Sequence, residues 1–241
     1  MAIKDIGILC SHCKRTFEMP RHVIIEMYRT IMSYSPLPTE ELELFKELRD
    51  LEVIFDVGAR TDTEYLDLRP DAEHHLFEPN PVFFKELEVK VGDKPNVFAN
   101  NFGLGDKEEG RGYYSPLQGF LGSGSVPEDA IPDCNLSLKT LGWYFEEKGL
   151  KKIDFLKIDT EGHDLKVIIG AYNWRDKIRF IQYEHWGEHN NKMIKGLLCE
   201  EFDIENVGYR NMFCMNRSLV SEEERNRLKT YIKDNRLGEL V

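Results

Sequence analysis

Apolar residues recur along the chain with two spacings, and each spacing predicts one kind of secondary structure. Apolar side chains three and four positions apart predict a helix over residues 21–33 and a second helix that begins at Thr39, a residue type that often caps helices. Farther along, short and nearly continuous apolar runs predict buried strands. These runs lie at residues 53–57, 75–78, 97–101, 153–159 and 180–184. Residues 113–115 would form a further extended piece, at an edge.

Helical patterns separate most of these strands, and the alternation predicts an α/β fold. Strands that alternate with helices form a mostly parallel sheet with helices on both faces. Residues 202–207 and 212–215 would add an antiparallel hairpin at the C-terminal end. We therefore expect an N-terminal helical extension over residues 1–50 and one main domain over residues 51–241. In such sheets ligands bind beyond the carboxyl ends of the strands, where the strand order reverses.

A segment rich in glycine, proline and serine interrupts the pattern at residues 115–133. A loop of this length inside a compact domain is usually functional or disordered. We expect it to lie over the strand ends as a lid that closes on the ligands and excludes water.

Composition and charge narrow the class of protein. The 241 residues are 41% hydrophobic and 31% charged, as in ordinary globular domains, and the formal net charge of −11 argues against a nucleic-acid partner. No apolar run has the length of a membrane span, and no signal sequence is evident. The five cysteines include one Cys-x-x-Cys pair, Cys10 and Cys13, which is too few ligands for a structural zinc site. We expect a cytoplasmic protein with reduced cysteines, and the apolar N-terminal helices leave a homodimer open.

The end of the first strand predicts a nucleoside site. In the run Asp56-Val57-Gly58-Ala59, the missing side chain of Gly58 lets a ligand approach the backbone at a partly positive helix N-terminus. Glu78 ends the second strand, 78 − 56 = 22 residues after Asp56. An acid about 20 residues after a glycine turn commonly binds ribose hydroxyls.

The same turn argues against a dinucleotide. The fingerprint G-x-G-x-x-G would need glycines at the positions of Arg60 and Thr63, and the carboxylate of Asp62 would repel a pyrophosphate. A sulfonium nucleoside with an amino group tolerates nearby acids. The chemistry therefore favours S-adenosylmethionine.

Four motifs in this order resemble those of FkbM-type methyltransferases. They are residues 56–59 (DVGA), 77–81 (FEPNP), 103–106 (GLGD) and 156–164 (LKIDTEGHD), and the resemblance covers about residues 51–186. It implies a Rossmann-like class I methyltransferase fold with a mostly parallel seven-stranded sheet. It also implies S-adenosylmethionine as cofactor and O-methylation, often of sugars or polyketide-type hydroxyls.

The resemblance also assigns residues to the parts of the cofactor. The methionine end falls to the glycine turn, the ribose to Glu78, and the adenine region to the ends of the second and third strands. The expected cofactor-binding residues are Asp56, Gly58, Ala59, Arg60, Glu78, Pro79, Asn80, Asn101, Phe102 and Asp159. This chain has Arg60 and Asp62 where the family usually has Asn and Gly.

Two mechanisms for the transfer fit the residues at the later strand ends. A sugar hydroxyl is a poor nucleophile, so a base or a metal ion is useful. In one mechanism His163 or His185 is the general base and Asp159 orients the acceptor, with Glu161 as a further catalytic candidate. In the other, Asp159, Glu184 and His185 bind Mg²⁺ or Mn²⁺. The structural alternative is that Asp159 and Glu161 cap the next helix and that His163 is a surface residue.

The sequence thus predicts an O-methyltransferase acting on a hydroxyl of a sugar, a glycan or a similar polyhydroxylated small molecule. One alternative is a methyltransferase of a peptide or another small metabolite. The other is a binding module that keeps the fold without the activity, for which Asp62 is the supporting feature.

Overall fold

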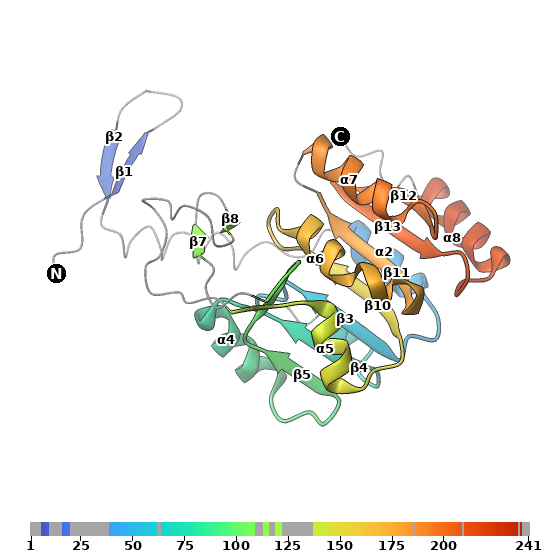
Figure 1. Ribbon diagram of the computed structural model, residues 1–241, viewed down its shortest axis with the longest axis horizontal. Coiled ribbons are helices and arrows are strands. Elements are labelled where there is room, and N and C mark those ends of the chain that lie inside the picture. Colours follow the sequence, from blue (N-terminus) through green and yellow to red (C-terminus); the bar gives the residue numbers. More distant parts are fainter. Residues whose placement is uncertain are drawn as a thin grey trace.

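A seven-stranded sheet organises the chain (Figure 1). The computed structural model describes residues 6–9, 16–19, 39–61, 64–108, 113–115, 119–121, 137–185, 187–208, 210–235 and 237. The strand order is β12-β13-β11-β10-β3-β4-β5, and only β13 is antiparallel to its neighbours. The strands are β3 (Val53–Val57), β4 (Glu73–Phe77), β5 (Val97–Asn100), β10 (Ile153–Ile158), β11 (Ile178–Glu184), β12 (Phe202–Gly208) and β13 (Asn211–Asn216). This confirms the predicted fold class, including the terminal hairpin β12–β13.

Helices cover both faces of the sheet, as the alternating pattern predicted. One apolar cluster joins the sheet to α5, α6 and α7, and a second joins the opposite face to α2, α3 and α8. Strand β10 is buried along its whole length and contributes Phe155 to one cluster and Leu156 to the other. The helices are α2 (Thr39–Glu47), α3 (Glu64–Leu68), α4 (Pro81–Val91), α5 (Leu141–Lys148), α6 (Asp164–Ala171), the 3-10 helix η1 (Tyr172–Lys177), α7 (Glu188–Leu198) and α8 (Glu222–Asp234).

The helix predicted to begin at Thr39 is α2, and it packs directly on the sheet. Leu44, Phe45 and Leu48 are buried in the second apolar cluster. The ring of Phe45 lies 4.7 Å from that of Tyr65 and 4.9 Å from that of Phe155, measured between centroids. This helix therefore shares its core with the main domain.

Three small two-stranded sheets complete the described structure. Strand β6 (Gly103–Leu104) pairs with β9 (Leu138–Lys139), β7 (Tyr113–Ser115) with β8 (Gly119–Leu121), and β1 (Ile6–Leu9) with β2 (Thr16–Met19). The hydrophobic pattern predicted β7 but neither β1 nor β2. The helix predicted over residues 21–33 and most of the predicted lid lie outside the described residues.

The order of the strands reverses at one position in the sheet. From β3 the chain continues to β4 and β5 on one side, whereas β10 and β11 lie on the other side. The order therefore reverses between β3 and β10, and their parallel carboxyl ends leave a crevice where ligands bind in such sheets. In the described part of the chain, no helix has the length and apolar character needed to span a membrane.

Candidate active site

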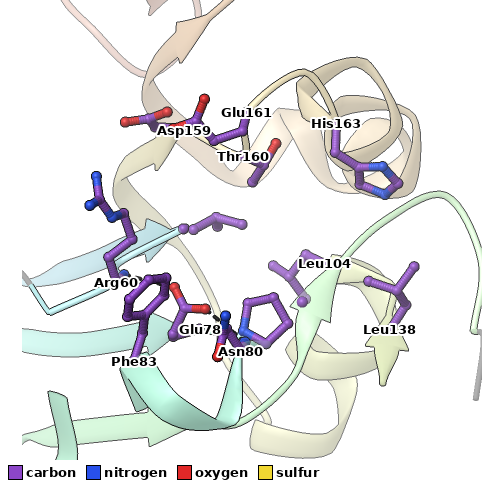
Figure 2. A pocket seen from close by; sticks show the side chains of 14 residues that line it. Arg60, Glu78, Asn80, Phe83, Leu104, Leu138, Asp159, Thr160, Glu161 and His163 are labelled. Atoms are coloured by element: carbon purple, nitrogen blue, oxygen red, sulfur yellow. Dashed lines mark hydrogen bonds between the residues drawn. The ribbon is translucent and has the colours of Figure 1, made fainter. Parts of the chain in front are cut away.

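A pocket lies at the carboxyl ends of β3, β4 and β10, at the point where the strand order reverses (Figure 2). Its empty volume is about 640 Å³, part of it open to solvent. The residues that line it are Val57, Gly58, Arg60, Glu78, Pro79, Asn80, Phe83, Gly103, Leu104, Leu138, Asp159, Thr160, Glu161 and His163. Gly58 of the predicted glycine turn and the predicted strand-end acids Glu78, Asp159 and Glu161 therefore face one cavity.

Gly58 lets the ends of β3 and β10 meet backbone to backbone. Its φ of 87° lies in the left-handed region, and a Cβ atom there would lie 1.8 Å from the carbonyl oxygen of Asp159. The Asp159 amide in turn donates to the Val57 carbonyl at 2.9 Å. Only glycine fits this position, for reasons of both conformation and space.

Glu78 is held in a fixed orientation by two backbone amides. Its Oε2 accepts from the Arg60 amide at 2.9 Å and its Oε1 from the Asn80 amide at 2.7 Å. Asn80 itself caps α4 by accepting from the Val82 amide. Glu78 is 4% exposed. Its burial raises the pKa of Glu78 to about 7, although the two amide hydrogen bonds oppose the rise. Each carboxylate oxygen has a further lone pair, so the group can still accept ribose hydroxyls.

Arg60 follows the glycine turn with a strained backbone. Its φ is 50°, which costs a side-chain-bearing residue about 1–2 kcal/mol. The guanidinium lies over the ring of Phe83, 5.8 Å from its centroid, and Figure 2 shows the Arg60 side chain reaching toward Asp159. Arg60 thus places a positive charge beside the strand-end acids.

A tight turn after β10 presents Asp159 and Glu161. Glu161 and Gly162 both have positive φ, 54° and 97°. The buried carboxylate of Asp164 holds this turn, since its Oδ2 accepts from the Thr160 hydroxyl at 3.1 Å and the Gly162 amide at 3.2 Å. Burial raises the pKa of Glu161, and the nearby charge of Asp159 adds to the rise. The turn therefore carries a carboxylate that binds protons more readily than an exposed glutamate.

Lys157 connects the two strand ends beneath the pocket. Its ammonium lies 3.0 Å from Asp56 Oδ1 and 3.7 Å from Asp159 Oδ2, and it donates to the Gly58 carbonyl at 3.4 Å. Asp56 is buried and does not line the pocket; burial raises its pKa, although the charge of Lys157 opposes the rise. Because a lysine inside a buried strand needs an anionic partner, its presence in the run from 153 to 159 was the available signal for this ion pair.

Besides Asp56, three other predicted cofactor residues support the pocket without lining it. The Ala59 amide donates to the Phe77 carbonyl, and the Asn101 side chain donates to the Glu78 carbonyl at 3.0 Å. Phe102 packs against the rings of Phe77, Trp143 and Tyr144. The wall residues Phe83, Leu104 and Leu138 were not predicted, because apolar side chains in a pocket have the same sequence pattern as those in a core.

The two candidate histidines lie in different places. His163 lines the pocket and is 5% exposed, and burial lowers its pKa to about 4. His185 follows β11 and does not line the pocket; its amide donates to the Arg210 carbonyl, and burial lowers its pKa. The structural alternative of a surface residue is therefore wrong for His163.

The predicted metal set is not formed. Across the described ranges, no three histidine, cysteine, aspartate or glutamate side chains are grouped so as to hold a metal ion, and Asp159, Glu184 and His185 are no exception. The electrostatics also disfavour a cation at Asp159, since the Lys157 ammonium lies 3.7 Å from its carboxylate and would repel one there.

The fold and the pocket together define a class of protein. A doubly wound sheet with a glycine turn and a strand-end acid at its switch point is typical of nucleoside-binding Rossmann-like enzymes. The model of the methyltransferase FkbM domain matches residues 56–210, more than half of the chain. The chain belongs to the FkbM methyltransferase family, which confirms the resemblance found in the sequence.

Two relatives and one solved structure show the range of similarity. The hexuronic acid methyltransferase AglP of Haloferax volcanii is 26% identical over 160 residues, 65% of either chain. The 2-O-methyltransferase NoeI of Sinorhizobium fredii is 26% identical over 173 residues, 61% of this chain and 71% of the relative. The S-adenosylmethionine complex of Aeropyrum pernix fibrillarin matches with a TM-score of 0.44 and 14% identity, covering 73% of each chain.

Proposed function

We propose that the pocket binds S-adenosylmethionine and that the protein transfers the methyl group to a hydroxyl of a sugar or glycan. The observation that carries this proposal is the shared pocket of Gly58 and Glu78 at the switch point of the sheet. The names of AglP and NoeI support the acceptor class, because one is a hexuronic acid methyltransferase and the other a 2-O-methyltransferase.

The lining residues fit each part of this cofactor. Glu78 offers free lone pairs to ribose hydroxyls, and Leu104 and Leu138 offer an apolar wall to a base. Arg60 and Asp159 suit a zwitterionic amino acid, since each of its charged groups would meet an opposite charge. A pocket for a neutral nucleoside would need no such charged end.

The bound cofactor would supply an electrophilic methyl group, and the protein has to align the acceptor and remove its proton. We assign proton removal to Glu161, because its raised pKa makes it a stronger base than an exposed carboxylate. Glu161 would take the proton of the acceptor hydroxyl onto a carboxylate oxygen while the hydroxyl oxygen bonds to the methyl carbon. The bond from that carbon to the sulfonium sulfur would break, with S-adenosylhomocysteine as the leaving group. Asp159, on the same turn, would accept a hydrogen bond from the acceptor and orient it.

Calorimetric titration with S-adenosylmethionine and S-adenosylhomocysteine tests cofactor binding. We expect the wild type to bind with micromolar affinity. Glu78→Ala should lose at least about tenfold in affinity, because charge-assisted hydrogen bonds to the ribose are lost. Glu86→Ala should leave the affinity unchanged. Glu86 is an exposed acid on α4 and controls for the lost charge. Failure of the wild type to bind either compound would contradict the proposal.

Transfer of labelled methyl groups tests the acceptor class. Glycans that contain hexuronic acids should become labelled in a stoichiometric, enzyme-dependent reaction, whereas peptides should not. Glu161→Gln should lower kcat by about 10²–10⁴-fold, the usual contribution of a positioned base. Labelling of peptides alone would contradict the sugar assignment while leaving the cofactor assignment intact.

A further inference from the structure

We propose that His163 belongs to the subsite for the purine base of the cofactor and that it takes no part in proton transfer. The inference rests on the proposed function and deepens it, because it gives the pocket a residue that distinguishes one base from another. The sequence had placed His163 among the catalytic candidates, and the pocket geometry is what separates it from them.

The pocket has two ends of different chemistry. Figure 2 shows Arg60, Asp159 and Glu161 toward one end, and Leu104, Leu138 and His163 toward the other. The charged end is formed by the glycine turn after β3 and the turn after β10. The apolar end is formed by the small sheet of β6 and β9 and by His163, the residue just before α6.

Glu78 relates these two ends to the parts of a nucleoside. In S-adenosylmethionine the ribose carries the base on one side and the amino acid chain on the other. A ribose bound by Glu78 therefore directs the charged chain toward one end of the pocket and the base toward the opposite end. Since Asp159, Glu161 and Arg60 form the charged end, the base falls to the apolar end, where His163 lies.

The imidazole of His163 is held firmly in that wall. A Cβ atom on Gly105 would lie 3.0 Å from His163 Nε2 and 3.7 Å from the side chain of Leu138, so glycine makes room for the ring. Gly105 is itself fixed, because its amide donates to the Lys139 carbonyl at 2.9 Å. Gly170 of α6 packs on the other side, where a Cβ atom would lie 2.0 Å from the Gly105 carbonyl oxygen. The helix that begins after His163 is thus locked against β6.

The chemistry of the imidazole suits hydrogen bonding to a purine better than removal of a proton from the acceptor hydroxyl. Burial lowers the pKa of His163 to about 4, so the imidazole is neutral at neutral pH and presents one donor and one acceptor nitrogen. Adenine offers an amino donor beside a ring nitrogen acceptor. A base with such a low pKa would remove a hydroxyl proton poorly.

The test compares S-adenosylhomocysteine with S-inosylhomocysteine, which differ only in the base, by calorimetric titration. Wild type should prefer the adenine compound by about tenfold or more, as one hydrogen bond to the base would give. His163→Ala should bind S-adenosylhomocysteine about 5–30-fold more weakly and lose most of the preference. Glu78→Ala should weaken both compounds and keep their ratio, and His185→Ala should keep both affinity and ratio.

His163→Gln serves as a second variant, since its amide restores a donor and an acceptor; it should recover part of the preference even if His163→Ala is poorly folded. In turnover, most of the loss in kcat/KM should appear in the KM for the cofactor. A wild type that binds both compounds equally, or a His163→Ala that keeps affinity and preference while kcat falls, would overturn the inference. Failure of the wild type to bind S-adenosylhomocysteine at all would instead contradict the proposed function.

Discussion

Glu78 is a buried acid whose protonation state and cofactor binding are coupled. Because its pKa is about 7, a cofactor that donates ribose hydroxyls binds best to the ionised form. Affinity should be constant above pH 7 and fall about tenfold for each pH unit below it. Titration from pH 5.5 to 8.5 measures this, and Glu78→Gln provides the pH-independent control. A wild-type affinity that stays flat across this range would contradict the role of Glu78.

The raised pKa of Glu78 has the opposite effect on the stability of the free protein, to which Glu78 contributes less as the pH rises. A carboxyl with a raised pKa binds a proton more tightly in the folded state, so its contribution to stability is present below about pH 4.5 and is lost as the pH rises through 7. Glu78→Gln carries a separate cost, since glutamine has only one acceptor oxygen for the amides of Arg60 and Asn80. We expect a loss of about 1–3 kcal/mol in urea unfolding at neutral pH.

Gly58 allows a close approach that no other residue permits. Gly58→Ala should destabilise the protein by about 4 kcal/mol or more, because the added Cβ atom would collide with the Asp159 carbonyl. Gly149, after α5, is the matched control: its φ is also positive, 62°, but an added Cβ atom would meet open space. Gly149→Ala should cost only about 1–2 kcal/mol. Equal unfolding free energies for the two variants would contradict the steric argument.

At the scale of elements, one carboxylate fastens α8 to β12. Asp203 on β12 forms ion pairs with Arg217 at 2.7 Å, Arg225 at 3.1 Å and Lys229 at 2.7 Å. Burial raises the pKa of Asp203, but the hydrogen bonds from Lys229 and Arg217 outweigh it and lower the value to about 2. This stabilisation is therefore complete above about pH 4 and is lost as the pH falls through 2.

Asp203→Ala should lower the free energy of unfolding at pH 7 by about 1–3 kcal/mol, since three cations lose their shared partner. Glu200→Gln, an exposed acid just before β12, should change it by less than about 0.5 kcal/mol. Urea titration followed by circular dichroism measures both. A similar small effect in both variants would show that α8 is held by its apolar contacts alone.

The apolar pattern identified the strands of the main sheet and the helix from Thr39, but it missed the two-residue strands β6 and β9. The strands of the main sheet and the helix from Thr39 matched the hydrophobic pattern, because each buries a regular face. The short pair β6–β9 had no such signal, since two residues cannot show a period. Yet this pair forms the apolar end of the pocket through Leu104 and Leu138.

At the scale of the whole molecule, α2 contributes to the core that supports the sheet. We propose that the folding unit includes this helix and so begins before the boundary at residue 51. Phe45→Ala should lower the free energy of unfolding by about 3–5 kcal/mol, the usual cost of a large cavity. Lys46→Ala, an exposed change on the same helix, should have little effect. A small effect of Phe45→Ala would mean that α2 packs loosely and that the boundary lies nearer residue 51.

The sequence by itself determined the fold class, the glycine turn, the acid at the second strand end and the family. These features are local, because a strand, a turn and a motif each depend on residues that are neighbours in the chain. Tertiary structure decided which strand ends meet, since strand order results from pairing between segments that are distant in sequence. It therefore decided that Lys157 joins Asp56 to Asp159, that the predicted metal ligands do not converge, and that His163 lies at the end of the pocket opposite the carboxylates.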